Sequence, residues 1–366
     1  MRYPKFLKEK GTVGFVAPSF GCAGEPYRSA FENAVKKWKE MGFGVDLGPN
    51  CFEASGTGIS NTPEKCAEEL NQYYLSSEND VLISCGGGEL MCEILEHVDF
   101  DAIKKGGPKW FMGYSDNTNM TFLLTTLCDT ASIYGPCGCV FGMEPWHVSI
   151  TDAVELLTGE KSVMNNYEKW EKEKLKDEEH PLLPYNCTEE FALKVYMPRK
   201  ESQRDSGIGA GEISLPQASG KEETGSGDME GRLIGGCMDC LVNLTGTRFD
   251  KVKAFTDRYK EDGFIWFLEA CDLNVFGIRR AMWQMEQAGW FRYAKGFLIG
   301  RPLCNGQEMI GLDQYEAVLP TVRRHKVPVI MDADLGHLPP MMPLVTGSMA
   351  EIKMEKEKLA ITMEYK

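Results

Sequence analysis

The sequence is poor in histidine, poor in positive charge and free of long apolar runs, and each shortage excludes a class of function. Lys and Arg number 40 against 54 Asp and Glu, which gives a formal net charge of −14. Such a surface repels nucleic acid and anionic membranes, so we expect neither as a partner. No apolar run approaches the roughly 20 residues of a transmembrane helix. The charged residues 1–10 lead directly into a strand-like segment, so we expect no signal peptide and a cytoplasmic location.

Thirteen cysteines are scattered through the predicted strands and helices, and we expect reduced thiols that lie mostly in the core. Two pairs have the spacing of metal ligands: Cys137 with Cys139, and Cys237 with Cys240. A structural zinc site needs four ligands, often with histidine among them. Since none of the five histidines is near either pair in sequence, we expect no metal ion and no cofactor.

Alternating strand and helix patterns in residues 1–159 predict an α/β fold with a parallel, flavodoxin-like sheet. Strands are expected at 12–17, 44–47, 81–85, 110–114 and 132–134, and helices at 27–41, 62–75, 90–97 and 120–128. Ligands bind where such strands end. The loops 18–24, 86–89 and 115–118 are therefore expected to lie together.

Composition changes sharply after this first domain. Residues 160–230 are dense in Lys and Glu and then in Gly and Ser, which predicts an inserted mobile loop or linker. A smaller α/β domain is expected at 231–366. In it we read 231–244 as a turn followed by a helix, 263–269 as a buried strand, and 352–363 as a closing hairpin.

Ser115 follows an apolar, aromatic strand and precedes Asp116, Asn117 and Thr118, which are good N-cap residues for the next helix. A serine at such a strand-to-helix turn is lifted out of the sheet beside the positive end of the helix, as a nucleophile would be. The alternative is a simple helix cap, which is a common role for serine.

A serine nucleophile needs a base, and His337 is the best placed of the five histidines, in a Gly- and Pro-defined loop after a strand. The residue that orients this base could be Glu269, at the end of an apolar strand, or Asp332 or Asp334, closer in sequence. These three alternatives remain open from the residues alone.

The run Gly86-Gly87-Gly88 joins a predicted strand to a helix and exposes N–H groups that no side chain covers. It could hold a phosphate, although it lacks the lysine of a Walker motif. It could instead supply one oxyanion-hole donor, with the amide of Asp116 as the other.

Together these segments resemble the serine peptidase family that contains murein LD-carboxypeptidases and the microcin C immunity protein. The blocks that carry the resemblance occur in the family's order: Gly14-Phe15-Val16-Ala17-Pro18-Ser19, Cys85-Gly86-Gly87-Gly88, Gly113-Tyr114-Ser115-Asp116-Asn117-Thr118, Gly231-Arg232-Leu233-Ile234-Gly235-Gly236, Phe267-Leu268-Glu269, Gly296-Phe297-Leu298-Ile299-Gly300-Arg301-Pro302 and Gly336-His337.

The resemblance implies a triad of Ser115, His337 and Glu269, and so favours Glu269 over the two aspartates. It implies an oxyanion hole made by the amide of Asp116 and that of Gly87 or Gly88. It also implies a nucleophile-bearing parallel-sheet domain, a smaller domain that carries Glu and His, and a homodimer.

The sequence departs from the family's commoner pattern in two places. The block Gly-Gly-Gly-Glu leaves open which glycine donates, and the long segment at 160–230 is similar to the microcin-immunity branch. In that branch an aromatic residue of this loop helps to hold a nucleotide-like substrate, and Trp170 is the candidate here. Anchoring a helix to the core is the alternative role for this tryptophan.

We therefore expect a serine carboxypeptidase that cleaves a small peptide amide, either a murein tetrapeptide or a peptidyl-nucleotide. An α/β-hydrolase esterase is an alternative, although the segment 113–117 lacks the second glycine of its nucleophile elbow. A non-catalytic protein that binds nucleotides or peptides is the other.

Overall fold

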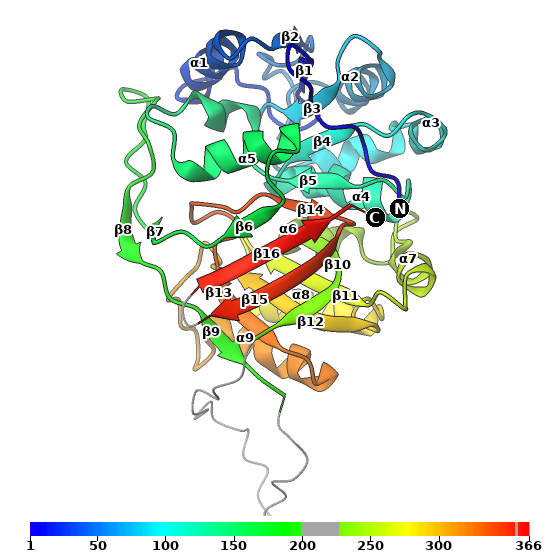
Figure 1. Ribbon diagram of the computed structural model, residues 1–366, viewed down its shortest axis with the longest axis vertical. Coiled ribbons are helices and arrows are strands. Elements are labelled where there is room, and N and C mark those ends of the chain that lie inside the picture. Colours follow the sequence, from blue (N-terminus) through cyan, green and yellow to red (C-terminus); the bar gives the residue numbers. More distant parts are fainter. Residues whose placement is uncertain (199–226, 356–357, 366) are drawn as a thin grey trace, which may run out of the picture.

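The computed structural model describes residues 1–198, 227–355 and 358–365. Over these ranges the chain forms a mixed α/β fold, with a parallel sheet in its N-terminal part and a second sheet in its C-terminal part (Figure 1). This confirms the predicted fold class. None of the helices within these ranges has both the length and the apolar character that a membrane crossing requires.

The N-terminal sheet has the strand order β14-β5-β4-β3-β1-β2. Strands β1 to β5 are mutually parallel, whereas β14 comes from the C-terminal part and pairs antiparallel with β5. The order 2-1-3-4-5 is that of flavodoxin-like sheets, in which ligands bind beyond the strand ends near β1 and β3. The bounds are β1 Thr12–Val16, β2 Gly44–Leu47, β3 Val81–Ser84, β4 Trp110–Gly113, β5 Ser132–Tyr134 and β14 Leu344–Thr346.

Helices cover both faces of this sheet, because successive side chains of its buried strands enter two different apolar layers. Phe15 of β1 belongs to one layer and Val16 to the other. The first layer holds α1 (Tyr27–Glu40), η3 (Gly138–Gly142) and α5 (Val148–Thr158). The second holds α2 (Pro63–Leu75), the 3-10 helix η1 (Met91–Glu96), α3 (Phe100–Lys105) and α4 (Thr118–Thr126).

The C-terminal sheet has the order β6-β16-β15-β10-β11-β12-β13-β9, with β10 to β13 parallel and the remaining pairs antiparallel. The strands are β6 Val163–Asn165, β9 Lys194–Tyr196, β10 Met229–Cys237, β11 Phe264–Glu269, β12 Ala294–Gly300, β13 Val329–Ala333, β15 Met349–Glu355 and β16 Lys358–Glu364. The helices that follow them are α6 Met238–Leu244, α7 Val252–Arg258, α8 Val275–Gln287, α9 Gln314–Val322 and η4 Arg323–His325. Helices α6 to α9 bury one face of the sheet.

The opposite face of the C-terminal sheet packs in the same apolar cluster as the N-terminal sheet. The rings of Phe267 on β11 and Tyr134 on β5 lie 5.5 Å apart across this junction. Both chain ends also lie at the junction, where Tyr3 and Tyr365 are in ring contact (Figure 1). The two sheets are thus joined through one shared apolar core.

Two expectations need correction. The first part of 231–244, predicted to be a turn, belongs to the central strand β10. Its glycines are typical of a loop, which explains the wrong prediction. Gly235 and Gly236 have φ of 152° and 143°, and a Cβ on Gly236 would lie 2.6 Å from Thr118. The glycines therefore allow close packing inside a sheet.

The segment 160–198, expected to be part of an inserted loop, contains four short strands joined by loops. β6 and β9 are the two edges of the C-terminal sheet, and β7 (Lys169–Glu171) pairs with β8 (Cys187–Glu190) in a separate hairpin. β6 and β9 are only three residues long, which is too short for an alternating apolar pattern to show, and the chain between them is rich in Lys and Glu. Residues 199–226 lie outside the described ranges.

Replacing Gly235 with Ala tests the role of the glycines in β10. The new Cβ would lie 1.7 Å from the carbonyl oxygen of Phe267 on β11. We expect the free energy of unfolding, measured by urea titration, to fall by roughly 3 kcal/mol or more. The control is Gly107→Ala, which meets nothing within 4 Å and is expected to change stability by about 0.5 kcal/mol or less. An unchanged unfolding midpoint for Gly235→Ala would contradict this view of the strand.

Candidate active site

Ser115 lies on a sharp turn between β4 and α4. Its φ of 61° is in the left-handed region, which is uncommon for a residue with a side chain. The short helix η2 (Ser115–Asn117) leads into α4, and neither helix has a side-chain cap at its start. The Ser115 hydroxyl instead lies 2.9 Å from His337 Nε2. The helix-cap alternative for Ser115 is therefore wrong.

Three hydrogen bonds hold the loops after β1, β3 and β4 together at the end of the sheet. The Asn117 amide donates to Gly86 O at 2.8 Å, and the Ser19 hydroxyl donates to Asp116 Oδ2 at 2.5 Å. The Phe20 N–H donates to Gly87 O at 2.6 Å. The predicted meeting of these three loops is confirmed.

The glycine run lies directly against the Ser115 side chain. A Cβ on Gly87 would lie 3.5 Å from Ser115 Oγ, whereas one on Gly88 would collide with Ser19. Of these two glycines, Gly87 is therefore the one next to the hydroxyl. The N–H of Asp116 belongs to the first turn of a helix and has no acceptor within it.

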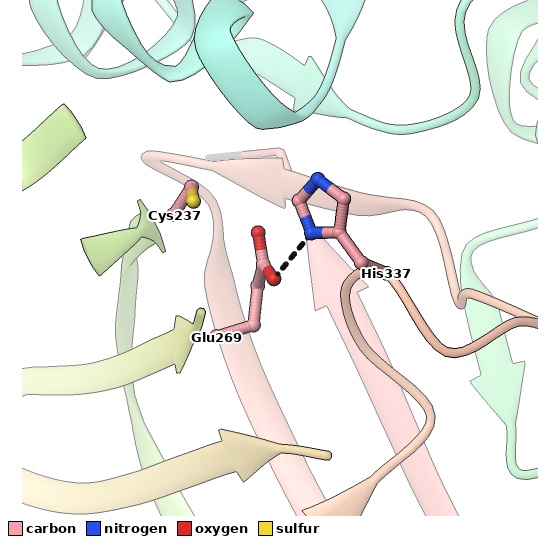
Figure 2. A group of neighbouring side chains, drawn as sticks. All are labelled: Cys237, Glu269 and His337. Carbon is pink, nitrogen blue, oxygen red and sulfur yellow. Dashed lines mark hydrogen bonds and ion pairs between the residues drawn. The ribbon is translucent and has the colours of Figure 1, made fainter. Parts of the chain in front are cut away.

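Glu269 and His337 reach the serine from the C-terminal sheet. Glu269 ends β11 and its side chain is 1% exposed, while the His337 side chain is 13% exposed. His337 Nδ1 lies 2.8 Å from Glu269 Oε2. Figure 2 marks this contact with a dashed line. Gly336 permits this contact, because a Cβ at that position would lie 2.4 Å from Glu269 Oε2. A continuous line of hydrogen bonds thus joins Glu269, His337 and Ser115.

The two aspartates that were alternatives to Glu269 have other partners. Asp332 accepts hydrogen bonds from Gln314 Nε2 at 3.1 Å and from the Tyr315 hydroxyl at 2.7 Å. Asp334 forms a buried ion pair with Arg301 and accepts from the Tyr167 N–H. Both stabilise the loop that carries His337, and Glu269 is the carboxylate that contacts its ring.

Tyr134 was missed by the sequence analysis. It ends β5, beside the strand that leads to Ser115, and its hydroxyl donates to Glu269 Oε1 at 2.5 Å. The hydroxyl oxygen of Tyr134 also accepts a hydrogen bond from the Ser115 N–H at 3.4 Å. Tyr134 therefore links the Glu269 carboxylate to the serine turn. A tyrosine at the end of the neighbouring parallel strand was the signal that could have revealed it.

The environment of the pair favours charge on both partners. Burial would raise the pKa of Glu269, but the charge of His337 and hydrogen bonds from His337 and Tyr134 outweigh it and hold this pKa below its ordinary value. Burial would lower the pKa of His337, but the Glu269 carboxylate and hydrogen bonds with Cys271 and Glu269 raise it well above 6.5. His337 must therefore lose a proton before its Nε2 can accept one from Ser115.

Trp170 lies in β7 and is 9% exposed. Its ring stacks on the Arg301 guanidinium at 4.9 Å, and its indole N–H donates to Glu190 O at 3.2 Å. The next residue, Glu171, donates its N–H to Pro339 O, two residues beyond His337. Trp170 thus supports the His337 loop through Arg301, and a direct contact with substrate stays a prediction.

Comparisons with known proteins agree with this architecture. Residues 13–135 match the family model for the LD-carboxypeptidase N-terminal domain, and residues 230–352 match that for the C-terminal domain. The chain is 24% identical to the microcin C7 self-immunity protein MccF of Escherichia coli, over 97% of this chain and 94% of MccF.

Two solved structures show the same fold. MccF in complex with glutamyl sulfamoyl guanosine superposes with a TM-score of 0.76 at 21% identity, covering 99% of this chain and 98% of MccF. An MccF-like protein of Bacillus anthracis gives a TM-score of 0.76 at 22% identity, with both chains fully covered. The two domain matches together span most of the protein, and the chain belongs to the LD-carboxypeptidase family, the S66 peptidases.

Proposed function

We propose that this peptidase is a serine-type carboxypeptidase that cleaves a small peptide amide through an acyl-enzyme. Ser115 is the nucleophile, His337 the general base and Glu269 the residue that orients it. Two contacts in a row carry the proposal. Ser115 Oγ lies 2.9 Å from His337 Nε2, and His337 Nδ1 lies 2.8 Å from Glu269 Oε2.

In this mechanism neutral His337 takes the proton of Ser115 as its oxygen attacks the amide carbon. The Glu269 carboxylate stabilises the imidazolium that forms, and Tyr134 holds that carboxylate in place. The N–H groups of Gly87 and Asp116 are the proposed donors to the oxyanion, with Gly87 preferred over Gly88 because it faces Ser115. His337 then protonates the leaving amine, and water resolves the acyl-enzyme.

An aminoacyl or peptidyl nucleotide is the proposed substrate class, with a murein tetrapeptide as the alternative. The support is the likeness to MccF, which has been observed with glutamyl sulfamoyl guanosine, and the position of the β7–β8 hairpin beside the His337 loop. A cytoplasmic homodimer and a substrate contact by Trp170 also stay predictions.

Replacing Ser115 with Ala is expected to reduce hydrolysis by roughly 10⁴-fold or more, because the nucleophile is lost while binding groups remain. Amine release measured with purified protein checks this. The control is Ser29→Ala on α1, whose hydroxyl donates to Glu25 far from the triad in sequence, and it should retain full activity. A folded Ser115→Ala variant that hydrolyses substrate at the wild-type rate would contradict the proposal.

The pH dependence of kcat/KM tests the role of the carboxylate. Since His337 acts as a base only when neutral, activity is low below its pKa and rises as pH passes through it. The raised pKa of His337 places the midpoint of this rise above 6.5. Glu269→Gln removes the negative charge, so the midpoint should move to lower pH and the maximal rate should fall by roughly 10³- to 10⁴-fold.

The matched control for Glu269→Gln is Asp332→Asn, since Asp332 bonds to Gln314 and Tyr315 and not to His337. This variant should leave the midpoint in place. If Asp332→Asn shifts the midpoint and Glu269→Gln does not, Glu269 is not the orienting group.

Parallel assays with an aminoacyl sulfamoyl nucleotide and a murein tetrapeptide separate the two substrate classes. We expect release of the amino acid from the nucleotide, detected by mass spectrometry, at a kcat/KM at least about tenfold above that for the tetrapeptide, a margin of 1.4 kcal/mol or more. Release of D-alanine from the tetrapeptide, with no hydrolysis of the nucleotide, would show that the substrate is the murein tetrapeptide.

A further inference from the structure

Cys237 lies beside the triad, although nothing in the mechanism uses it. It ends β10 in register with Glu269 at the end of β11. The sequence offered no histidine near this cysteine, but the fold brings His337 to it from 100 residues downstream. Figure 2 shows the thiol of Cys237, the carboxylate of Glu269 and the ring of His337 gathered at the strand ends.

One ligand atom from each of these three residues lies within 4.8 Å of the other two. Across residues 1–198, 227–355 and 358–365 this is the one such group of three or more potential metal ligands. In tetrahedral zinc sites, bond lengths of roughly 2.0–2.3 Å place neighbouring ligand atoms about 3.5 Å apart. Side-chain shifts of about 1 Å would therefore bring the three donors into the zinc shell.

The donor set selects a particular kind of ion. Thiolate and imidazole suit Zn²⁺ and Cd²⁺, whereas Mg²⁺ prefers six oxygen ligands in an octahedron. A thiolate and a carboxylate together carry two negative charges, which a divalent ion neutralises in this buried setting. A fourth position would remain for water or for the Ser115 hydroxyl, which already contacts His337.

We propose that Cys237, Glu269 and His337 form a binding site for a thiophilic divalent ion, Zn²⁺ or Cd²⁺, and that this ion switches the triad off. Coordination by Nε2 occupies the lone pair that would accept the Ser115 proton. Coordination by Nδ1 leaves the remaining ring proton on Nε2, with the same result. Either geometry also takes Glu269 away from the ring that it orients.

Titration with Cd²⁺ tests the site without relying on turnover, because a bound cadmium thiolate absorbs in the ultraviolet. We expect the Cys237→Ser variant to lose one equivalent of this absorption and to bind Zn²⁺ at least about tenfold more weakly than wild type. The matched control is Cys304→Ser, since Cys304 is a free, half-buried cysteine outside the three-ligand group. This control should titrate like wild type.

The inhibitory part rests on the proposed function and is measured separately. Zn²⁺ should suppress hydrolysis by the wild type and by Cys304→Ser, EDTA should restore it, and Mg²⁺ should have no effect. Cys237→Ser should need at least about tenfold more Zn²⁺ for the same loss, relative to its own metal-free rate. A Cys237→Ser variant that binds Cd²⁺ and responds to Zn²⁺ as wild type does would overturn the proposal. A wild type that binds Cd²⁺ at Cys237 but hydrolyses no substrate would overturn the proposed function alone.

Discussion

The buried pair of Glu269 and His337 is the interaction on which the rest of the site depends. A carboxylate at 1% exposure is costly unless every oxygen has a partner. One oxygen is matched by His337, from the same part of the chain, and the other by Tyr134, from the N-terminal sheet. The pair is therefore fully satisfied only when the two sheets are packed against each other.

This dependence explains why the site lies at the junction of the two sheets. The serine turn, the glycine run and Tyr134 come from the first sheet, and Glu269, His337 and Cys237 come from the second. Gly236 packs against Thr118 at the start of α4, and Thr118 accepts a hydrogen bond from the Cys237 N–H. The same contacts that fix the sheets relative to one another thus fix the distance from Ser115 to His337.

Local patterns in the sequence predicted the first sheet well, because each strand and each helix has its own regular spacing of apolar residues. They failed at β10, where glycines that permit close strand packing look the same as those of a turn. They failed again at β6 and β9, because strands of three residues are too short to show an alternating pattern. The contacts of Ser115, Glu269 and His337 were expected from a family resemblance. Finding Tyr134 and Cys237 also required knowing which strands lie side by side, and the pattern within one strand does not give this.

Labelling with a fluorophosphonate probe, followed by peptide mapping, tests the central claim most directly, since the probe bonds to an activated serine hydroxyl. We predict a single adduct on Ser115 in the wild type and loss of that adduct in a folded His337→Ala variant. An adduct on another serine, or equal labelling of Ser115 without His337, would contradict the account.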